Sequence, residues 1–241
     1  MISYCTECDF LLGLYATVET VKMQSLYKAY GKDCDFLSFW KQTEGENIGA
    51  VIMRFCDEIT LYYCGGNREE LKEFLRFLGG SRIFCSLNSA KKLSLNVIKK
   101  VNCCIRNKER LKTEKGKILT YNEIYNVLNS DTTGELILPQ FNDWYVDFCH
   151  RVRHNTARYF SLFENSVIIT AYETENYAII GGVATKPDFR NKGYASKNLT
   201  ALCGILHSED KKVLLLCSDK NLKFYEKNGF SATEKYTYAE I

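Results

Sequence analysis

The chain has 241 residues, of which 46% are hydrophobic and 25% charged, and its formal net charge is +3. This composition is that of a globular protein, so it excludes disorder, collagen and coiled coil, and the balanced charge gives no reason to expect a nucleic-acid partner. No apolar run approaches the ~20 residues of a membrane helix, and no basic leader is visible, so we expect a cytoplasmic protein without a membrane partner.

Four strands, rich in β-branched and aromatic residues, are predicted in the first half at 36–41, 48–55, 59–64 and 83–87. Between the last two, Asn67 and Glu70 have the spacing of a helix N-terminal cap. The amphipathic helix that follows is predicted to run to Leu78 and to end at Gly79 and Gly80.

Residues 91–117 concentrate positive charge, with ten Lys or Arg against two Glu. The segment has no aromatic residue on which a base could stack. We therefore interpret it as a solvated helix and linker, which is the usual meaning of a charge block.

In the second half the signals for turns and helix caps are clearer. A short strand is predicted at 117–119, and Thr120 and Glu123 form a capping box before a helix that ends near Asn129. An amphipathic helix is predicted at 141–155, with His150 and His154 on its polar face. The remaining predictions are strands at 157–163, 167–173, 177–185, 213–217 and 230–238, and helices at about 195–206 and 221–227.

The order strand, strand, strand, helix, strand thus occurs twice, with an offset of roughly 120 residues, which indicates a structural repeat. The expected fold class is α/β, with a mixed, mostly antiparallel sheet flanked by helices in each of two tandem domains. The expected domains are residues 1–112 and 113–241, joined near 105–118.

Eleven cysteines form no disulfide framework, because their number is odd and their spacing irregular. Cys5 and Cys8 could pair with His150 and His154 as zinc ligands, but about 140 residues separate the two pairs, far beyond finger spacing. No metal is therefore expected, and reduced thiols are the simpler account.

The segment from Val183 to Ser196 carries the clearest chemical signal. A buried strand runs into a short loop, and a helix then begins behind Gly193. Unpaired amides and the positive end of the helix dipole attract anions there, and Arg190 and Lys192 add positive charge. The pattern is neither a P-loop nor a dinucleotide fingerprint, so it indicates a phosphate or pyrophosphate site of another kind.

The motif Arg190-x-x-Gly193-x-Ala195 resembles the Arg/Gln-x-x-Gly-x-Gly/Ala loop of the GNAT superfamily of acyl-CoA-dependent N-acyltransferases. The strand sequence Val-Ala-Thr-x-Pro precedes it, and the stretch from Asn221 to Phe230 resembles the family's Asn-x-x-Phe-Tyr-x-x-x-Gly-Phe segment. The resemblance covers residues 117–241, about half of the chain. The first half looks like a degenerate copy whose loop, at residues 64–68, lacks the pattern.

The resemblance implies a fold, a cosubstrate and a site. Acetyl-CoA would be the acyl donor, and no metal would be needed. Tyr225 would be the general acid that protonates the departing thiolate, and an N–H of the strand, at Val183, would polarise the thioester oxygen. The implied cofactor-binding residues are Val183, Ala184, Thr185, Arg190, Asn191, Lys192, Gly193, Tyr194, Ala195, Ser196 and Asn221.

Simpler interpretations exist for each of these residues. Tyr225 would otherwise be a core tyrosine, Asn221 a helix cap and Arg190 a solvated charge. Where some family members carry a glutamate base on the strand before the loop, this chain has Ile179. Glu173, Glu175 or a chain of water molecules could take its place.

Two functions remain open at this stage. The chain could transfer an acetyl group from acetyl-CoA to a primary amine of a small molecule or peptide, as a monomer or homodimer. Alternatively, it could be a non-catalytic acyl-CoA sensor or interaction module. The intact loop and Tyr225 favour the enzyme, whereas the missing strand carboxylate favours the sensor.

Overall fold

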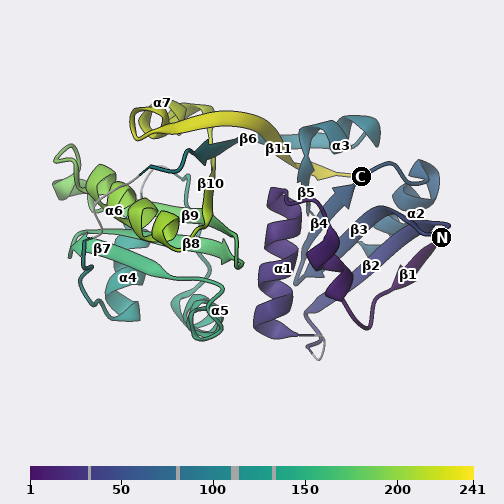
Figure 1. The fold of residues 1–241 in the computed structure, drawn as a ribbon, viewed down its shortest axis with the longest axis horizontal. Coiled ribbons are helices and arrows are strands. Elements are labelled where there is room, and N and C mark those ends of the chain that lie inside the picture. Colours follow the sequence, from purple (N-terminus) through teal and green to yellow (C-terminus); the bar gives the residue numbers. More distant parts are fainter. Residues whose placement is uncertain (32–33, 80–81, 110–113, 132–133) are drawn as a thin grey trace. The chain divides into compact units, whose positions relative to one another are not determined.

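The computed structural model describes residues 1–31, 34–79, 82–109, 114–131 and 134–241. Its contacts divide the chain into two compact units. Unit 1 comprises Met1–Asn102 together with Glu234–Ile241, and unit 2 comprises Cys103–Thr233. Strands β1 to β5 belong to unit 1 and strands β7 to β10 to unit 2 (Figure 1).

Unit 1 has one sheet with the strand order β1-β2-β3-β4-β5-β11-β6. Neighbours from β1 to β4 are antiparallel, and β5 is parallel to β4. Its elements are β1 (Ile2–Tyr4), the 3-10 turn η1 (Asp9–Gly13), α1 (Val18–Tyr30), β2 (Leu37–Glu44), β3 (Asn47–Phe55), β4 (Glu58–Tyr63), α2 (Arg68–Leu78), β5 (Arg82–Ser86), α3 (Leu87–Lys92), and parts of β6 (Asn96–Arg106) and β11 (Phe230–Glu240).

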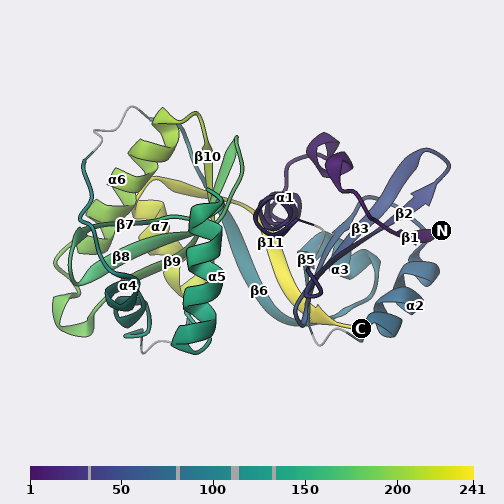
Figure 2. The ribbon, with the colours of Figure 1, turned by 90° about the horizontal axis from the view of Figure 1, so that it is seen from below.

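Helices cover both faces of this sheet (Figure 2). On one face Leu71 and Leu75 of α2 pack with Ile83 and other inward residues. Because successive strand residues point to opposite faces, Phe84 faces the other side, where Lys22 of α1 lies over its ring. Unit 1 is therefore a helix–sheet–helix sandwich.

The sequence analysis did not predict α1, and its burial explains why. Residues 18–23 are all buried, so the helix shows no apolar stripe at helical spacing. Its start is instead set by a capping box in which Thr17 accepts a hydrogen bond from the Thr20 amide. Where every side of a helix is covered, periodicity carries little signal.

The end of the chain completes the sheet of unit 1. Tyr236 to Ala239 pair antiparallel with Ser86 to Ile83 of β5. Tyr236 is fully buried and stacks on Phe84, with ring centroids 5.5 Å apart. The predicted domains at 1–112 and 113–241 remain a prediction, and residues 110–113 around their boundary lie outside the described residues. The compact units assign residues 103–112 and 234–241 differently from that division.

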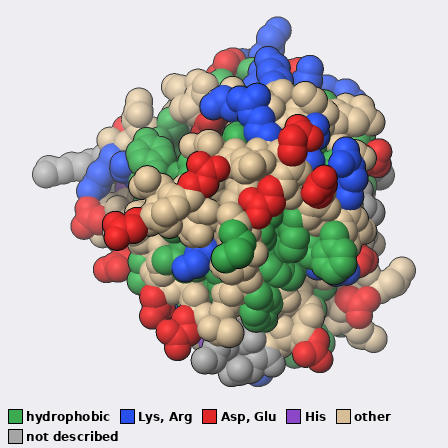
Figure 3. Space-filling view, turned by 90° about the vertical axis from the view of Figure 1, so that its right-hand side faces the viewer, with side chains coloured by type: hydrophobic (Ala, Val, Ile, Leu, Met, Phe, Trp, Pro, Cys, Tyr) green, Lys and Arg blue, Asp and Glu red, His purple; other side chains and the backbone are tan. Residues whose placement is uncertain are grey.

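Unit 1 also exposes large aromatic side chains. Tyr4 of β1 and Phe77 of α2 are exposed, and contacts through Trp40 and Phe74 link them. Figure 3, which looks at the right-hand side of Figure 1, shows hydrophobic side chains gathered in one area, with acidic and basic side chains around them.

Unit 2 has the strand order β7-β8-β9-β10-β6-β11, in which the last residues of β6 and the first of β11 take part. Strands β7, β8 and β9 are antiparallel, and β10 is parallel to β9. Its own elements are α4 (Tyr121–Leu128), α5 (Phe141–Arg153), β7 (Tyr159–Phe163), β8 (Ser166–Glu173), β9 (Tyr177–Thr185), the 3-10 turn η2 (Pro187–Phe189), α6 (Tyr194–Ser208), β10 (Lys212–Cys217) and α7 (Asp219–Lys227).

Two hydrophobic clusters define the two faces of unit 2. One joins α6 and β10 with Phe230 and Cys104, and the other joins α4 and α5 with Val167 of β8 and Ala184 of β9. Figure 2 shows α6 on one side of the strands and α4 and α5 on the other. Among the described residues, no helix is long and apolar enough to cross a membrane.

The predicted repeat is confirmed as an order of elements. In unit 1 β2, β3, β4, α2 and β5 repeat the order and strand directions of β7, β8, β9, α6 and β10 in unit 2. The predicted cap at Asn67, the αL C-cap at Gly79 and the capping box at Thr120 are also present. Gly80, predicted to help end the first helix, lies outside the described residues.

Two predictions are wrong. Residues 117–119 are not a strand, because a single backbone hydrogen bond, from the Lys117 amide to Ser161, ties them to β7. The basic stretch is not chiefly a solvated helix and linker, since β6 spans Asn96–Arg106 within it. Lys99 and Lys100 occupy exposed positions of β6, while Val101, Cys103 and Cys104 are buried.

Candidate functional site

The two central parallel strands of unit 2 pair over only part of their length. The pairing of β9 with β10 runs from Tyr177–Lys212 to Ile180–Leu215. β9 continues to Thr185 and β10 to Cys217, but beyond Ile180 no further residues pair. The edge of β9 that faces β10 is therefore left open at residues 181–185, where a ligand can add main-chain hydrogen bonds as a strand would.

A double irregularity at Gly181 marks the start of this open edge. Opposite Ile169 and Thr170 of β8 stand Gly182 and Ile180, so Gly181 has no partner, and Ala171 is skipped in the same way. A Cβ on Gly181 would lie 2.3 Å from the Cβ of Ala171, so only glycine fits. Bulges change which way side chains point and are common beside active sites.

The bulge decides where the predicted strand residues point. Ala178 and Ile180 belong to the cluster under α6, but beyond the bulge Val183 packs on that cluster, whereas Ala184 belongs to the opposite one. Thr185 ends the strand, and its hydroxyl lies 2.9 Å from that of Ser166. The glycine pair in the strand could have revealed this bulge from the sequence.

The predicted anion loop has the geometry that its residues suggested. Gly193 has φ +76° and occupies the N-cap position of α6, which lacks a side-chain cap and an acidic residue in its first turn. The first amide engaged by the helix is that of Lys197, which donates to Gly193. In the described chain, the six preceding amides, from Asn191 to Ser196, donate to no protein acceptor. Unpaired amides at the positive end of a helix form an anion site.

The side chains around this loop hold it in place. The Arg190 Nε donates to the Thr185 carbonyl at 3.0 Å, and its guanidinium lies 3.6 Å from Asp131. Lys192 is exposed and donates to the Asp188 carbonyl at 3.2 Å. Arg190 is thus bound to the strand end and is more than the solvated charge of the simpler interpretation.

The first turn of α6 is anchored to the sheet on one side. Tyr194 stacks on Phe163 with ring centroids 4.1 Å apart. Buried Asn198 donates to the Ser166 carbonyl and accepts the Leu162 amide, at 3.0 and 2.8 Å. Ala195 and Ser196 are half-buried between these anchors, so the backbone of the loop is held before any ligand arrives.

Tyr225 and Asn221 lie on α7, four residues apart and therefore on one helix face. Tyr225 packs on the same hydrophobic cluster as Val183, Cys104 and Cys217. Burial first, and then the nearby Cys217, Cys104 and Glu135, raise the pKa of Tyr225, so its phenol stays protonated at neutral pH. Its hydroxyl forms no hydrogen bond within the described chain, which leaves its proton available to a ligand.

Asn221 is not the cap of α7. The N-cap position belongs to Ser218, and Asn221 lies in the first turn, half-buried, with its amide N–H donating to the Ser218 carbonyl. Its side chain is therefore not used in capping, unlike the simpler interpretation of an asparagine at a helix start.

Glu135 is a residue that the sequence analysis missed. The Ser218 hydroxyl donates to its carboxylate at 3.0 Å, and its charge acts on Tyr225. It lies in the segment between α4 and α5, where no motif or periodicity distinguishes it. Only the folded chain places this carboxylate beside α7.

The two carboxylates considered as bases lie at the wrong end of the strand. Glu173 is opposite Ala178, about 16 Å along β9 from Val183 at 3.3 Å per residue. Burial opposes its ionisation, but hydrogen bonds and charge from Arg158 and Lys211 keep the pKa of Glu173 below its usual value. Glu175 is exposed in the adjacent turn, and Ile179 is buried. A structural ion pair, not catalysis, accounts for Glu173.

The described residues contain no group of three or more candidate metal ligands. The rings of His150 and His154, at the end of α5, have centroids 4.2 Å apart and are tilted by 33°, and all eleven cysteines are free thiols. Cys85 on β5 and Cys217 on β10 are both buried.

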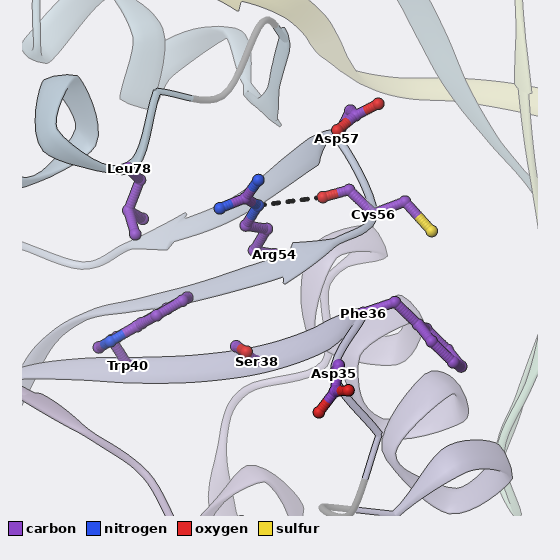
Figure 4. A pocket seen from close by; sticks show the side chains of 8 residues that line it. All are labelled: Asp35, Phe36, Ser38, Trp40, Arg54, Cys56, Asp57 and Leu78. Carbon is purple, nitrogen blue, oxygen red and sulfur yellow. Dashed lines mark hydrogen bonds between the residues drawn. The ribbon is translucent and has the colours of Figure 1, made fainter.

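A separate hollow lies on unit 1 (Figure 4). It has a volume of about 420 Å³, and Arg54 lies at its centre with Nε donating to the Cys56 carbonyl at 3.1 Å. Cys56 and Asp57, in the turn between β3 and β4, line the hollow. The Cys64–Asn67 turn, which corresponds to the anion loop of unit 2, follows the other end of β4 and does not line it. No predicted site residue lines it; its walls are Asp35, Phe36, Ser38, Trp40, Arg54, Cys56, Asp57 and Leu78.

Comparison with known proteins finds a family match within unit 2. Residues 121–230 match the model of the acetyltransferase (GNAT) family. Residues 121–230 of unit 2 therefore form a GNAT-family domain. A search of curated proteins finds no match.

Solved structures of GNAT proteins resemble the whole chain. An acetyltransferase from Colwellia psychrerythraea is 14% identical, with a TM-score of 0.57 and 100% of both chains covered. A tandem GNAT protein from the clavulanic acid biosynthesis pathway is 10% identical, with a TM-score of 0.59 and 99% and 98% covered. A GNAT protein from Sphaerobacter thermophilus is 11% identical, with a TM-score of 0.59 and 90% and 84% covered. The predicted mixed α/β fold with two GNAT-like copies is thereby confirmed.

Proposed function

We propose that unit 2 takes an acyl group from an acyl-CoA, with acetyl-CoA as the preferred donor, and transfers it to a primary amine of a small molecule or peptide. The observation that carries the proposal is the run of unpaired amides from Asn191 to Ser196 beside the open edge of β9. A pyrophosphate needs such donors, and an amide-containing arm needs such an edge. GNAT-family membership supports the same donor.

In this proposal the loop residues Arg190 to Ala195 hold the pyrophosphate, with the Ser196 hydroxyl as an additional donor. Val183, Ala184 and Thr185 pair through their main chain with the pantetheine arm, which the Asn221 amide also contacts. The N–H of Val183 polarises the thioester oxygen. These residues fit an acyl-CoA because the strand edge is open, the loop amides are unpaired and Asn221 is not used as a cap.

Two protons must move during the transfer. The amine attacks the thioester carbonyl, and Tyr225 gives its proton to the departing thiolate, which its protonated phenol suits. The attacking nitrogen must also lose a proton. We assign the acceptance of that proton to the carboxylate of Glu135, in place of the missing strand glutamate. This carboxylate accepts a hydrogen bond from Ser218, the N-cap of α7, and its charge acts on Tyr225.

Thermal unfolding with acetyl-CoA or CoA tests the binding step. A ligand that binds only the folded chain raises the melting temperature, so both should produce a concentration-dependent increase. No increase with either compound would reject the acyl-CoA assignment. Release of free CoA thiol with a panel of amines then separates the enzyme from a non-catalytic module, which would bind without release.

The variant Tyr225→Phe tests the acid. We expect thiol release to slow by about 100-fold while acetyl-CoA affinity is retained, because a general acid contributes at least that factor. The control is Tyr159→Phe, which removes a hydroxyl bonded to the Leu119 carbonyl elsewhere in unit 2. Equal rates for wild type and Tyr225→Phe would remove Tyr225 from the reaction.

A further inference from the structure

Two buried thiols face each other inside unit 2. Cys104 is on β6 and Cys217 ends β10, and these strands are neighbours in the sheet. Their sulfurs are 3.8 Å apart, and the side chains are 0% and 6% exposed. Both belong to the cluster on which Tyr225 packs. The proposed acyl-transfer chemistry uses neither thiol.

The contact favours one thiolate over the other. A hydrogen bond from Cys217, opposed by burial, lowers the pKa of Cys104. The same hydrogen bond, reinforced by burial, raises the pKa of Cys217. Cys104 therefore ionises before Cys217, and the thiolate is the form that reacts with oxidants.

The geometry is close to that of a disulfide. A disulfide needs its sulfurs at about 2.05 Å, so rotation of the two side chains must close roughly 1.8 Å. β6 and β10 are neighbouring strands, and the usual spacing of such strands, about 4.8 Å, lies within the range of Cα separations that a disulfide spans. Cys217 also lies past the last β9–β10 pair, at the open end of β10.

We propose that Cys104 and Cys217 are a redox modification site that forms a reversible disulfide with hydrogen peroxide. The Cys104 thiolate attacks one peroxide oxygen, which gives a sulfenic acid and, after protonation, one water. The Cys217 sulfur then attacks the sulfenic sulfur and expels the second oxygen as water. Two thiols are oxidised, one peroxide is reduced to two waters, and dithiothreitol reverses the bond by exchange.

A consequence follows that rests on the proposed function. If the pantetheine arm lies along β9 toward the open end of β10, it covers Cys217. Saturating CoA should then slow disulfide formation. Disulfide formation at an unchanged rate would count against the proposed acyl-CoA position and would leave the thiol pair itself standing.

The experiment uses the full chain with the exposed Cys56 and Cys64 replaced by serine, so that peroxide meets fewer competing thiols. After peroxide treatment and alkylation, peptide mass spectrometry should show Cys104 linked to Cys217, and dithiothreitol should abolish the link. Cys104→Ser should prevent it. The matched control is Cys103→Ser, a buried neighbour on the opposite face of β6, which should still form the link.

Because Cys104→Ser could affect folding, circular dichroism and melting of each variant are compared first, and Cys217→Ser provides a second test. Absence of a Cys104–Cys217 peptide in oxidised, folded protein would overturn the proposal. So would dominant linkage of either cysteine to another partner, or a Cys104–Cys217 link that dithiothreitol does not reverse.

Discussion

The turn after β4 in unit 1 and the turn after β9 in unit 2 occupy the same place in the repeated order, but unit 1 pairs two amides, those of Gly66 and Glu70, whose counterparts in unit 2 are unpaired. In both units the parallel pairing stops before the strands end, at Thr60–Phe84 and at Ile180–Leu215. The open pair of strands is therefore common to both copies. What differs is the segment that follows.

In unit 1 the turn uses some of its own donors. The amides of Cys64 and Gly66 both donate to the Gly49 carbonyl, and the amide of Glu70 donates to the Asn67 side chain. Buried Gln42 closes the turn by donating to Asn67 and Glu70. Glu69 and Glu70 then add negative charge to the first turn of α2.

In unit 2 the corresponding amides are unpaired and no acid stands at the start of α6. The comparison teaches that the two turns differ in the backbone donors and in the charge that they leave at the helix start. The same strands and helix without those donors form only a scaffold. That residues 64–68, which lack the loop pattern, bind no pyrophosphate stays a prediction.

The largest effect should come from the strand that serves both units. Tyr236→Ala should destabilise unit 1 by about 4 kcal/mol, because it removes a fully buried aromatic side chain stacked on Phe84. Phe230→Ala, near the start of the same strand, should act on unit 2. Hydrogen exchange resolved by peptide measures each unit, and equal loss of protection in both units from either variant would contradict the division.

The two units should respond oppositely to loss of a buried carboxylate. Glu173→Gln should destabilise unit 2 by about 3 kcal/mol at pH 7, since it breaks a buried ion pair with Arg158 and Lys211. Burial raises the pKa of Glu19 in unit 1, so Glu19→Gln should be neutral or stabilising at pH 7. Denaturant unfolding of both variants makes the comparison.

The pH dependence has a defined sign in each unit. Because the folded-state pKa of Glu173 is depressed, its contribution is present above its unfolded-state pKa and is lost as pH falls through the folded value. Because that of Glu19 is raised, its contribution is complete below the unfolded-state pKa and is lost as pH rises through the folded value. Denaturant unfolding at several pH values measures this dependence. If unit 2 lost the same unfolding free energy on acidification in the Glu173→Gln variant as in the wild type, Glu173 would not be the cause of the loss.

The variant Gly193→Glu should weaken acetyl-CoA binding by at least about 100-fold, equivalent to about 2.8 kcal/mol. It adds a charge where an anion is expected and places a side chain at φ +76°. The control is Gly79→Glu in unit 1, at φ +63° and equally free of close contacts. Isothermal titration should show normal affinity for the control, and normal affinity of Gly193→Glu would refute the loop assignment.

The smallest effect concerns the caps. Asn67→Ala should cost about 1 kcal/mol, because it removes the side-chain acceptor of the Glu70 amide. Ser196→Ala should change stability by less than about 0.5 kcal/mol, since α6 has no side-chain cap to lose. A loss of equal size in both variants would show that the two helix starts are satisfied in the same way.

Much of this fold was predictable because its signals are local. The strands at 48–55 and 177–185, the caps at Asn67 and Thr120, and the loop at Gly193 follow from alternation, side-chain acceptors and backbone freedom in short segments. Helix α1 and strand β6 were missed, since the first is buried on several sides and the second carries charge on its exposed positions. Neither has the periodicity on which such a prediction depends.

The candidate site residues also differ in whether a local pattern reveals them. Arg190, Gly193 and Tyr225 stand in recognisable motifs, whereas Glu135 lies in a segment without any pattern. The sequence also could not show that Glu173 lies far from the open edge of β9. Its position depends on the ion pair with Arg158 and on the pairing with Ala178, and both are set by the tertiary structure.

The sequence by itself determined the resemblance to the GNAT superfamily, the repeated order of elements and the glycine that begins α6, because these depend on residues close together in the chain. Only the tertiary structure decided that residues 234–241 complete unit 1, that the bulge at Gly181 turns Val183 toward Tyr225's cluster, and that Cys104 meets Cys217. Contacts between distant segments are set by strand register and packing, which no local pattern encodes.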